Sequence, residues 1–542
     1  MHSPPRALIS VFDKTGIVDF AAGLNDLGWE IISTGGTSKK LREAGIPVKD
    51  ISQITAHPEI FDGRVKSLHP AIHGSILARL ENEKDKQGLD ELGYTPIKLV
   101  AVNLYPFSES ASQVPPLNDS ELLEMIDIGG PTLLRASAKN HKNVLPISNP
   151  ERYSKILELL RGVEGDPLQI NLDYRTKLAL ETFEHTASYD VAISKELHKR
   201  WVGEANESVE LEESISKLPN RFLIDSEIKE IMRYGENPHQ AAAFYENPSE
   251  NNTNLGNFTM HSGKALSYNN YIDLDAALRL ARNLSTEDWP QTPFACVIVK
   301  HNNPCGAALS GTQVDAWVDA LASDPESAFG CIVAFNTRVT VETANKIADH
   351  FVECIIAPSF ETEALELLSK KKNRRLLSIK ENMSKLTPNT SQVVAKQISG
   401  GWLLQTERSP KIDPKLSRIV TSIEPSEQEI AAMKFGIVVC EQVKSNSVIF
   451  VKGTKTVGIG PGQTSRVEAV RIAARRAGED AKGAVMVSDA FFPFRDGIDA
   501  ANEIGITSIV QPGGSIRDQE VIDAANEYNM SMLFTGVRLF RH

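Results

Sequence analysis

Short apolar runs alternate with stretches of helical period along the first part of the chain, and this alternation constrains the fold more than any other feature. Ala7–Val11 predicts a buried strand, and the apolar residues of 17–27 then recur at the spacing of one helix face. Glu30–Thr34 predicts the next strand. Ile97–Leu104 is apolar almost throughout, as strands are when helices cover both faces of a parallel sheet. Strands and helices in alternation predict an α/β fold.

The chain is too long for one compact core, since its 542 residues exceed the roughly 100–200 residues of a typical domain. A helical stretch, Arg175–Trp201, ends the first region, and the segment after it is rich in Glu, Ser and Asn. We therefore predict a first domain at residues 1–201, a linker at 202–220 and a second domain at 221–542. The strands expected in the second domain lie near Cys296–Lys300, Gly330–Phe335, Ser447–Val451, Val485–Ser488 and Ser508–Gln511. The basic run Lys370–Arg375 predicts a solvated turn.

Charge and composition exclude several classes of protein. The 58 Lys and Arg against 70 Asp and Glu leave a net charge of −12, which argues against a nucleic acid partner. No stretch approaches the roughly 18–20 consecutive apolar residues of a membrane span, and the chain starts without an apolar signal region. Neither a membrane partner nor secretion is expected. The five cysteines, without a CxxC pair, indicate reduced thiols of a cytoplasmic protein: Cys296, Cys305, Cys331, Cys354 and Cys440.

Two glycine-containing turns follow the first two expected strands. Ser33–Thr37 carries hydroxyls and two glycines before a helix, and Asp13–Gly16 brings a cation and a further hydroxyl to the equivalent turn. A helix N-terminus favours an anion, and ligands of open α/β sheets bind at the carboxyl ends of strands. Either turn alone is compatible with a tight structural connection. Together they favour a phosphate site.

Three further segments of the first domain carry groups that could move protons. Gly63–Pro70 contains Arg64 and Lys66, which point to one side of an extended segment. Asn103–Phe107 ends a strand with the phenol of Tyr105, and Asp127–Pro131 presents a carboxylate at a strand-to-helix turn. The alternatives are an exposed basic loop and a core phenol. A sugar-phosphate pocket with Lys, Tyr and Asp beside it would suit a ring closure that loses water.

The segment Lys300–Gly306 carries the most specific chemistry of the second domain. A buried strand delivers Lys300 and His301 side by side to a turn broken by Pro and Gly. Two desolvated titratable groups cost stability unless they are used or paired. Histidine transfers protons near neutral pH, and lysine can stabilise a developing oxyanion. Cys305 is interpreted as small filler, because the pattern of the zinc deaminases is missing.

Several other polar segments could contribute to a site in the second domain. The turn Gly460–Arg466 is rich in glycine and precedes a helix with four arginines, which makes it a second anion-site candidate. The aromatic residues of Ser488–Asp496 could be core, or could hold a flat heteroaromatic ligand. The remaining segments are Arg233–Gln240, Lys444–Ser447 and the C-terminal Arg538–His542.

Taken in order from end to end, these motifs resemble those of the bifunctional purine biosynthesis family, which joins phosphoribosylaminoimidazolecarboxamide (AICAR) formyltransferase to IMP cyclohydrolase. The resemblance implies a methylglyoxal-synthase-like α/β domain carrying the cyclohydrolase in the first half. It implies a formyltransferase of two cytidine-deaminase-like α/β units, without their zinc chemistry, in the second half. The family resemblance also implies a homodimer.

By the same resemblance, the second domain transfers a formyl group from the co-substrate 10-formyltetrahydrofolate to AICAR, giving formyl-AICAR. His301 would take up the amine proton, while Lys300 and Asn446 would steady the tetrahedral oxyanion. The residues expected to bind the nucleotide and the folate are Arg233, Tyr234, His239, Gln463, Arg466, Phe491, Phe494, Asp496 and His542.

In the first domain the resemblance implies closure of formyl-AICAR to IMP, with no catalytic metal. The residues that match the cyclohydrolase set are Lys66, Tyr105, Asp127 and Lys139. The expected phosphate and ribose contacts are Ser10, Lys14, Ser33, Gly36, Thr37, Arg64 and Ser67.

Two positions depart from the family pattern, and two other functions compete with it. Phe12 stands where many members have Ser, and Pro461 replaces a small residue, so ligand affinity is more affected than the acid-base groups. One alternative is a methylglyoxal-synthase-like lyase acting on a triose phosphate. The other is a nucleotide-sensing first domain, which would bind ligand without turnover.

Overall fold

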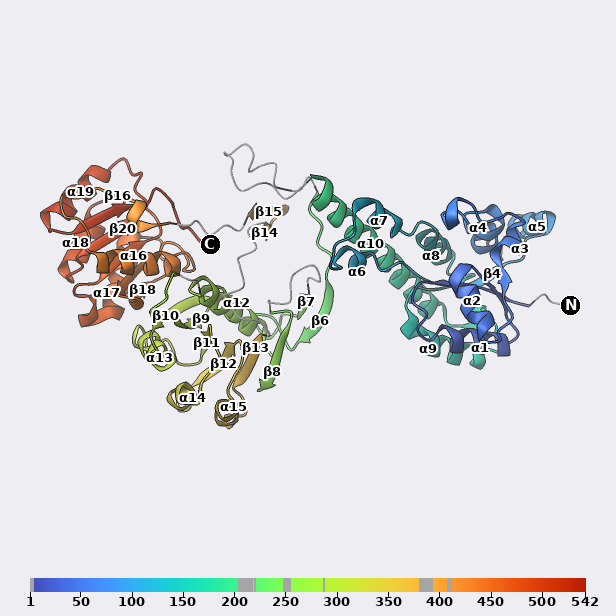
Figure 1. Ribbon diagram of the computed structural model, residues 1–542, viewed down its shortest axis with the longest axis horizontal. Helices are drawn as coiled ribbons and strands as arrows, with labels where there is room; N and C mark the ends of the chain where they lie inside the picture. The colour runs from blue at the N-terminus through green and yellow to red at the C-terminus, as the bar shows by residue number, and fades with distance from the viewer. Residues whose placement is uncertain are drawn as a thin grey trace. The chain divides into compact units, whose positions relative to one another are not determined.

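The computed structural model describes residues 4–202, 218, 221–246, 255–285, 288–379, 393–406 and 412–542 (Figure 1). It divides into two compact units, Met1–Asp225 and Ser226–His542. Each unit contains a β-sheet with parallel strands and helices packed on it, so the expected α/β class is confirmed. Apart from residues 202 and 218, the linker predicted at 202–220 lies outside the described residues.

The first unit is built on a five-stranded sheet in which every pairing is parallel. Along β1 the side chains alternate between two hydrophobic clusters, so that Ile9 packs on one face and Leu8 on the other. Because the strands run in one direction, their carboxyl ends lie along one edge, where ligands of such sheets bind. In sheet order the strands are β3 (Lys49–Asp50), β2 (Glu30–Ser33), β1 (Arg6–Val11), β4 (Ile97–Asn103) and β5 (Leu145–Ile147).

Helices connect these strands and cover the sheet. α2 (Gly35–Glu43) follows β2 after one residue, and the two glycines of the Ser33–Thr37 segment are its first residues. α10 (Leu172–Val202) extends the predicted stretch Arg175–Trp201 at both ends. The others are α1 (Ile17–Asp26), α3 (Ile51–Thr55), α4 (Pro70–Leu77), α5 (Glu83–Leu92), α6 (Phe107–Ala111), α7 (Asp119–Glu124), α8 (Gly129–Lys139), α9 (Tyr153–Gly162) and the 3₁₀ turns η1 (Phe61–Gly63), η2 (Pro150–Arg152) and η3 (Pro167–Gln169).

The second unit is built on a twelve-stranded mixed sheet. Its two wings are parallel, β19-β20-β21 and β11-β12-β13, and antiparallel pairings through β17, β18, β10 and β9 join them. In sheet order the strands are β16 (Arg418–Ile419), β21 (Ser531–Phe534), β20 (Ser508–Gln511), β19 (Val485–Ser488), β17 (Val448–Lys452), β18 (Lys455–Gly460), β10 (Asn303–Ser310), β9 (Phe294–Lys300), β11 (Cys331–Phe335), β12 (Val352–Ala357), β13 (Arg375–Ile379) and β8 (Phe258–Ser262).

Helices and two hairpins complete the second unit. Among the described residues, none of the helices in either unit is both long and apolar enough to cross a membrane. The helices are α12 (Tyr268–Asn283), α13 (Gln313–Ala322), α14 (Val341–Ile347), α15 (Thr362–Ser369), α16 (Glu427–Cys440), α17 (Arg466–Ala477), α18 (Asp496–Glu503), α19 (Asp518–Glu527), η5 (Pro414–Leu416) and η6 (Gly478–Ala481). The hairpins are β6 (Glu227–Met232) with β7 (Ala242–Glu246), and β14 (Val393–Ile398) with β15 (Gly401–Thr406).

The basic run Lys370–Arg375 is not a solvated turn throughout, and this prediction is wrong for its last two residues. Arg374 is 2% exposed, and its guanidinium donates hydrogen bonds to the carbonyl oxygens of His350, at 2.6 Å, and Ala348, at 3.3 Å. Arg375 is the first residue of β13. Backbone carbonyls at and after the end of α14 accept from Nη2 of this buried guanidinium, while Nη1 has no partner among the residues described, and a pattern of basic residues does not reveal such burial.

Candidate functional site

Two side-chain hydroxyls predicted to contact phosphate hydrogen-bond to β1 in this structure. Ser33 Oγ donates to the carbonyl oxygen of Ile9 at 2.6 Å. Thr37 Oγ1 accepts from the amide of Val11 at 3.1 Å and donates to its carbonyl oxygen at 2.9 Å. Both side chains are buried. They fix the start of α2 against the carboxyl end of β1, which leaves the backbone of that turn as the surface open to a ligand.

Lys14, in the loop between β1 and α1, lies over this turn. Its Nζ donates to the carbonyl oxygens of Val11, at 2.6 Å, and Phe12, at 2.9 Å. Its Cε is 4.0 Å from where a Cβ would stand on Gly36, so lysine and glycine are neighbours. Burial lowers the pKa of Lys14, and the charge of Asp13 partly opposes this. The structure therefore brings Lys14 to the N-terminus of α2.

Lys66 reaches the same turn from the segment before α4. Its Nζ lies 3.6 Å from a Cβ built on Gly35, and it forms an ion pair with Glu59 at 3.0 Å. Arg64, two residues earlier, pairs with Glu124 and points to that partner. Lys66 is thus placed at the sheet edge, whereas Arg64 is engaged on the surface.

Asp127 stands at the start of α8 beside these groups. The amide of Gly130 donates to its Oδ1 at 2.8 Å. Burial raises the pKa of the Asp127 carboxyl, while two backbone amides and the charge of Lys66 act in the other direction. Ser67 Oγ lies 2.9 Å from a Cβ built on Gly129, so the Lys66 segment and the Asp127 turn are in contact.

Tyr105 and Lys139 take different places around this edge. The ring of Tyr105 packs against Phe12 with a centroid distance of 5.3 Å, directly after β4. Lys139 ends α8, an eleven-residue helix that begins at Gly129, two residues after Asp127. At about 1.5 Å per residue, the backbones of Asp127 and Lys139 are roughly 18 Å apart. Lys139 lines a separate pocket of about 460 Å³ together with His73, Arg135 and Phe183. Within this chain the structure does not bring Lys139 to Asp127.

In the second unit, Lys300 and His301 lie at a tight hairpin turn between β9 and β10. His301 and Asn302 both have positive φ, 52° and 63°, as in a two-residue type I′ turn. Asp273 on α12 accepts hydrogen bonds from the amides of both residues, at 3.2 Å and 2.5 Å. Burial raises the pKa of Asp273. Lys300 Nζ donates to the carbonyl oxygen of Phe329 at 2.8 Å.

A chain of short contacts joins this turn to Asn446. Asn303 pairs with Lys300 in the hairpin, and its Oδ1 accepts from the amide of Lys444 at 3.1 Å. Asn446 and Gln463 exchange two backbone hydrogen bonds, at 3.0 Å and 3.1 Å. The Lys300 turn, the Asn446 segment and the turn before α17 therefore meet at the centre of the large sheet.

Arg466, the first residue of α17, points inward from the same place. Its Nη2 donates to Asn446 Oδ1 at 2.6 Å. Its Nη1 donates to Ser488 Oγ at 2.8 Å and pairs with the carboxylate of Asp489. The predicted nucleotide contact Arg466 is thus a buried residue that hydrogen-bonds Asn446, Ser488 and Asp489.

The C-terminal tail is anchored beside Asn446. Ser445 and Arg541 exchange two hydrogen bonds of 2.9 Å, and the amide of Leu539 donates to the carbonyl oxygen of Asp489 at 2.9 Å. The rings of Phe540 and His542 lie 5.5 Å apart. Although chain ends commonly fray, this one places His542 close to the Asn446 segment.

The other predicted contacts lie on loops around this centre. Arg233 stacks on Tyr234 at 5.6 Å from the ring centroid, in the β6–β7 loop. This loop approaches α12, where Asn269 Nδ2 donates to the carbonyl oxygen of Glu236 at 3.5 Å. His239 is exposed in the same loop. Phe491 and Phe494 are also exposed, after β19, and Asp496 begins α18: their side chains are available to a ligand.

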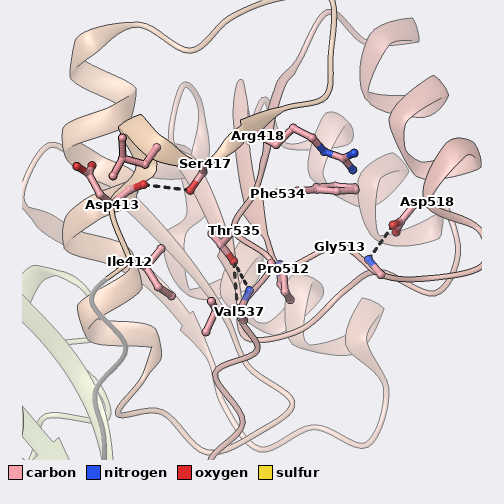
Figure 2. A pocket seen from close by; sticks show the side chains of 13 residues that line it. Ile412, Asp413, Ser417, Arg418, Pro512, Gly513, Asp518, Phe534, Thr535 and Val537 are labelled. Carbon is pink, nitrogen blue, oxygen red and sulfur yellow. Dashed lines mark hydrogen bonds between the residues drawn. The ribbon is translucent and has the colours of Figure 1, made fainter. Parts of the chain in front are cut away.

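A pocket of about 660 Å³ opens elsewhere, at the β16–β21 edge of the sheet (Figure 2). Arg418 lies over the ring of Phe534, 5.5 Å from its centroid, and Asp518 accepts from the amide of Gly514 at 2.7 Å. None of the predicted site residues lines this pocket. The candidate chemistry of the second unit therefore lies at the central turns rather than here.

Comparisons with known proteins agree with this arrangement. A family model described as AICARFT/IMPCHase bienzyme matches residues 137–476, and one described as MGS-like domain matches residues 16–132. The bifunctional purine biosynthesis protein PurH of Persephonella marina is 46% identical over 542 residues, covering 99% of each chain. The chain belongs to the AICARFT/IMPCHase family.

Two further relatives extend this likeness over the whole length. The proteins of the same name from Aquifex aeolicus and Acetivibrio thermocellus are each 44% identical to it, over 99% of this chain. A solved structure, that of ForH, is 36% identical and covers 36% of this chain and 100% of its own, with a TM-score of 0.33. As a member of the AICARFT/IMPCHase family, the chain has an MGS-like N-terminal domain and is a bifunctional enzyme of purine biosynthesis with formyltransferase and cyclohydrolase activities.

Sequence reasoning gave no role to two carboxylates of the second unit, the half-buried Asp273 and the buried Asp489. Asp273 holds the His301 turn, and Asp489 holds Arg466. A usable signal existed for Asp273, because an aspartate within the apolar pattern of α12 must find buried donors. Cys305 is buried, and burial raises the pKa of its thiol to about 12, which agrees with its interpretation as filler.

Proposed function

We propose that formyl transfer takes place at the turn that carries Lys300 and His301. The 5-amino group of AICAR attacks the formyl carbon of 10-formyltetrahydrofolate, and the carbonyl oxygen becomes an oxyanion. His301 accepts the amine proton, and Lys300 and Asn446 stabilise the oxyanion. The tetrahedral intermediate then collapses: the bond from the formyl carbon to N10 of the folate breaks, and N10 leaves with a proton.

The observation that carries this proposal is the contact chain from the hairpin turn to Asn446. Lys300 pairs with Asn303, whose side chain accepts from the Lys444 amide two residues before Asn446. A base, a cation and an amide donor therefore belong to one neighbourhood. The nucleotide and folate contacts follow from loops near it: Arg233, Tyr234, His239, Gln463, Phe491, Phe494, Asp496 and His542.

We further propose that ring closure takes place at the sheet edge of the first unit. The carboxamide nitrogen of formyl-AICAR attacks the formyl carbon and loses a proton. The formylamino nitrogen loses a second proton as the C–O bond breaks and the ring C=N bond forms, so the formyl oxygen leaves as water carrying two protons. Asp127, whose raised pKa favours the protonated carboxyl, supplies a proton to that oxygen, and Lys66 and Tyr105 stabilise the charge that develops. Lys139 remains a proposed member of this set, although it lies at the other end of α8.

The 5′-phosphate is proposed to bind at the N-terminus of α2. Lys14 supplies a cation there, and the backbone amides of the Gly35–Gly36 turn point outward from a helix start. Ser10, Arg64 and Ser67 complete the proposed contacts. The hydroxyls of Ser33 and Thr37 support this cradle by fixing the turn to β1.

We also propose that the enzyme is a cytoplasmic homodimer. Five buried free thiols suit a reducing compartment, and the dimer follows the family resemblance. Light scattering of the purified protein tests the dimer: a mass near twice the 59.5 kDa of one chain is expected, and a monomer would contradict it.

A coupled assay tests the two activities. The purified enzyme is incubated with AICAR and 10-formyltetrahydrofolate, and IMP is followed with the folate present or omitted. IMP should form only with the folate. Methylglyoxal from a triose phosphate would favour the lyase alternative, and ligand binding without turnover would favour the nucleotide sensor.

A further inference from the structure

Arg466 and Asp489 form a buried ion pair at the start of α17. Their side chains are 6% and 0% exposed. Taking two charges out of water is costly and is repaid only when the remaining donors and acceptors are well satisfied. Here the arginine uses one nitrogen for Asp489 and Ser488 and the other for Asn446.

The contact with Arg466 determines which way the amide of Asn446 faces. An asparagine amide can turn over with little change of shape, but its two ends differ, since one only accepts and the other only donates. Arginine has donors alone, so Asn446 Oδ1 must face Arg466, at 2.6 Å. Nδ2 then points the other way, where one N–H donates to the carbonyl oxygen of Thr464 at 3.3 Å. The second N–H remains for a ligand.

Asp489 is held so that it acts on the arginine and not on a substrate. Its amide donates to the carbonyl oxygen of Ser447 at 3.3 Å, and its own carbonyl oxygen accepts from Leu539. One carboxylate oxygen pairs with Arg466, and the other has no hydrogen-bond partner among the residues described. The pairing with Arg466 is therefore the main stabilisation of this buried charge.

We propose that Asp489 and Arg466 are positioning residues that hold Asn446 with Nδ2 toward the formyl oxygen. This inference rests on the proposed formyl transfer, and it gives Arg466 an indirect role in place of the predicted nucleotide contact. An amide turned the other way would present an acceptor to the developing oxyanion and repel it. The pair thus contributes to the rate of the chemical step rather than to substrate binding.

The test compares Asp489→Asn with the exposed control Asp480→Asn. Loss of one oxyanion donor costs roughly 10²–10³ in kcat, so partial misorientation should lower kcat by about ten- to a hundredfold, with each KM changed less than about threefold. The same substitution in an Asn446→Ala background should lower kcat by less than about twofold, because the residue it positions is gone. Ring closure of supplied formyl-AICAR, catalysed by the first unit, controls for the amount of active enzyme, and the thermal unfolding midpoint reports on the fold of the second unit.

Arg466→Lys is the second variant should Asp489→Asn fail to fold. Lysine keeps a charge for Asp489 but lacks the second nitrogen that holds Asn446, so the same loss of kcat is expected. An unchanged kcat, an equal fall in both Asn446 backgrounds, or a raised KM with kcat kept would each overturn the inference. Absence of formyl transfer in the unsubstituted enzyme would instead contradict the proposed function.

Discussion

Burial changes the chemistry of single carboxyl groups in both units. At Asp127 the loss of water raises the pKa, and the amides of Gly129 and Gly130 with the charge of Lys66 only partly offset it. The carboxyl therefore keeps its proton to a higher pH than an exposed aspartate does. Such a group suits the donation of a proton to a departing water, at some cost to stability whenever it is ionised.

Asp127→Asn is expected to stabilise the fold near neutral pH while stopping ring closure. The folded carboxyl has the higher pKa, so wild-type stability falls as pH rises from the unfolded pKa through the folded one. Asparagine carries no such penalty. Thermal unfolding should show a higher midpoint for the variant at pH 7, with the gap narrowing toward acid pH, and kcat of ring closure should fall by roughly 10²–10⁴.

Formyl transfer serves as the control for this variant, since Asp127 lies in the other unit. A lower unfolding midpoint at pH 7 together with normal ring closure would show that Asp127 is an ordinary structural residue.

Among the secondary-structure elements, the hairpin turn between β9 and β10 sets the geometry around His301. The hairpin turn at His301–Asn302 requires two successive positive φ values, which asparagine tolerates and β-branched residues do not. Asp273 fixes this turn from α12 through both amides. The position of His301 therefore depends on Asn302 adopting a positive φ.

Asn302→Val should destabilise the enzyme by about 1–2 kcal/mol and reduce formyl transfer, because valine resists the left-handed region. Asn302→Gly is the matched control: glycine adopts that conformation freely, so the free energy of unfolding and kcat should stay near wild type. Urea unfolding and the formyl transfer assay measure both. Equal behaviour of the two variants would show that the turn does not constrain His301.

α17 packs closely on β18 at Gly460, and a second prediction follows from this contact. A Cβ on Gly460 would stand 2.0 Å from the carbonyl oxygen of Ala469, a backbone atom that cannot move alone. Gly460→Ala should cost at least about 1–3 kcal/mol of unfolding free energy and displace the start of α17. Gly401→Ala is the control, because nothing lies within 4 Å of its added methyl group. Denaturant unfolding of both variants decides the matter.

Periodicity predicted three of the five strands of the first sheet and missed the short strands β3 and β5. β1, β2 and β4 lie where the apolar runs place them, since buried parallel strands leave a continuous signal. Pro304 and Gly306 suggested a broken loop, yet both belong to β10. The register shifts between them, and a Cβ on Gly306 would meet the carbonyl oxygen of Ala320 at 1.9 Å. The helix behind the strand explains that glycine, and helix packing is not written in local sequence.

The candidate sites, too, were predictable from the sequence only in part. Lys66 and Asp127, predicted from separate motifs, lie close together, since Ser67 Oγ is 2.9 Å from a Cβ built on Gly129. Neither follows a strand directly: Lys66 lies between η1 and α4, and Asp127 lies between α7 and α8, so the strand-to-helix turn predicted at Asp127 is wrong. The order of the motifs could not show that the hydroxyls of Ser33 and Thr37 donate hydrogen bonds to β1, or that Arg466 faces the core. These outcomes depend on which partner each side chain finds in three dimensions.

At the scale of the whole molecule, the two proposed sets of catalytic groups belong to different compact units. Lys66, Tyr105 and Asp127 are in the first, and Lys300 and His301 are in the second. Each unit has its own sheet and its own hydrophobic clusters. We therefore expect that a substitution can abolish either reaction without affecting the other.

The most direct measurement assays both reactions separately in His301→Ala and in Lys66→Ala. His301→Ala should abolish formyl transfer and close supplied formyl-AICAR at the wild-type rate, because its defect is confined to the β9–β10 turn. Lys66→Ala should form formyl-AICAR normally and let it accumulate. If either substitution removes both activities from a chain that remains folded, the assignment of two independent sites is contradicted.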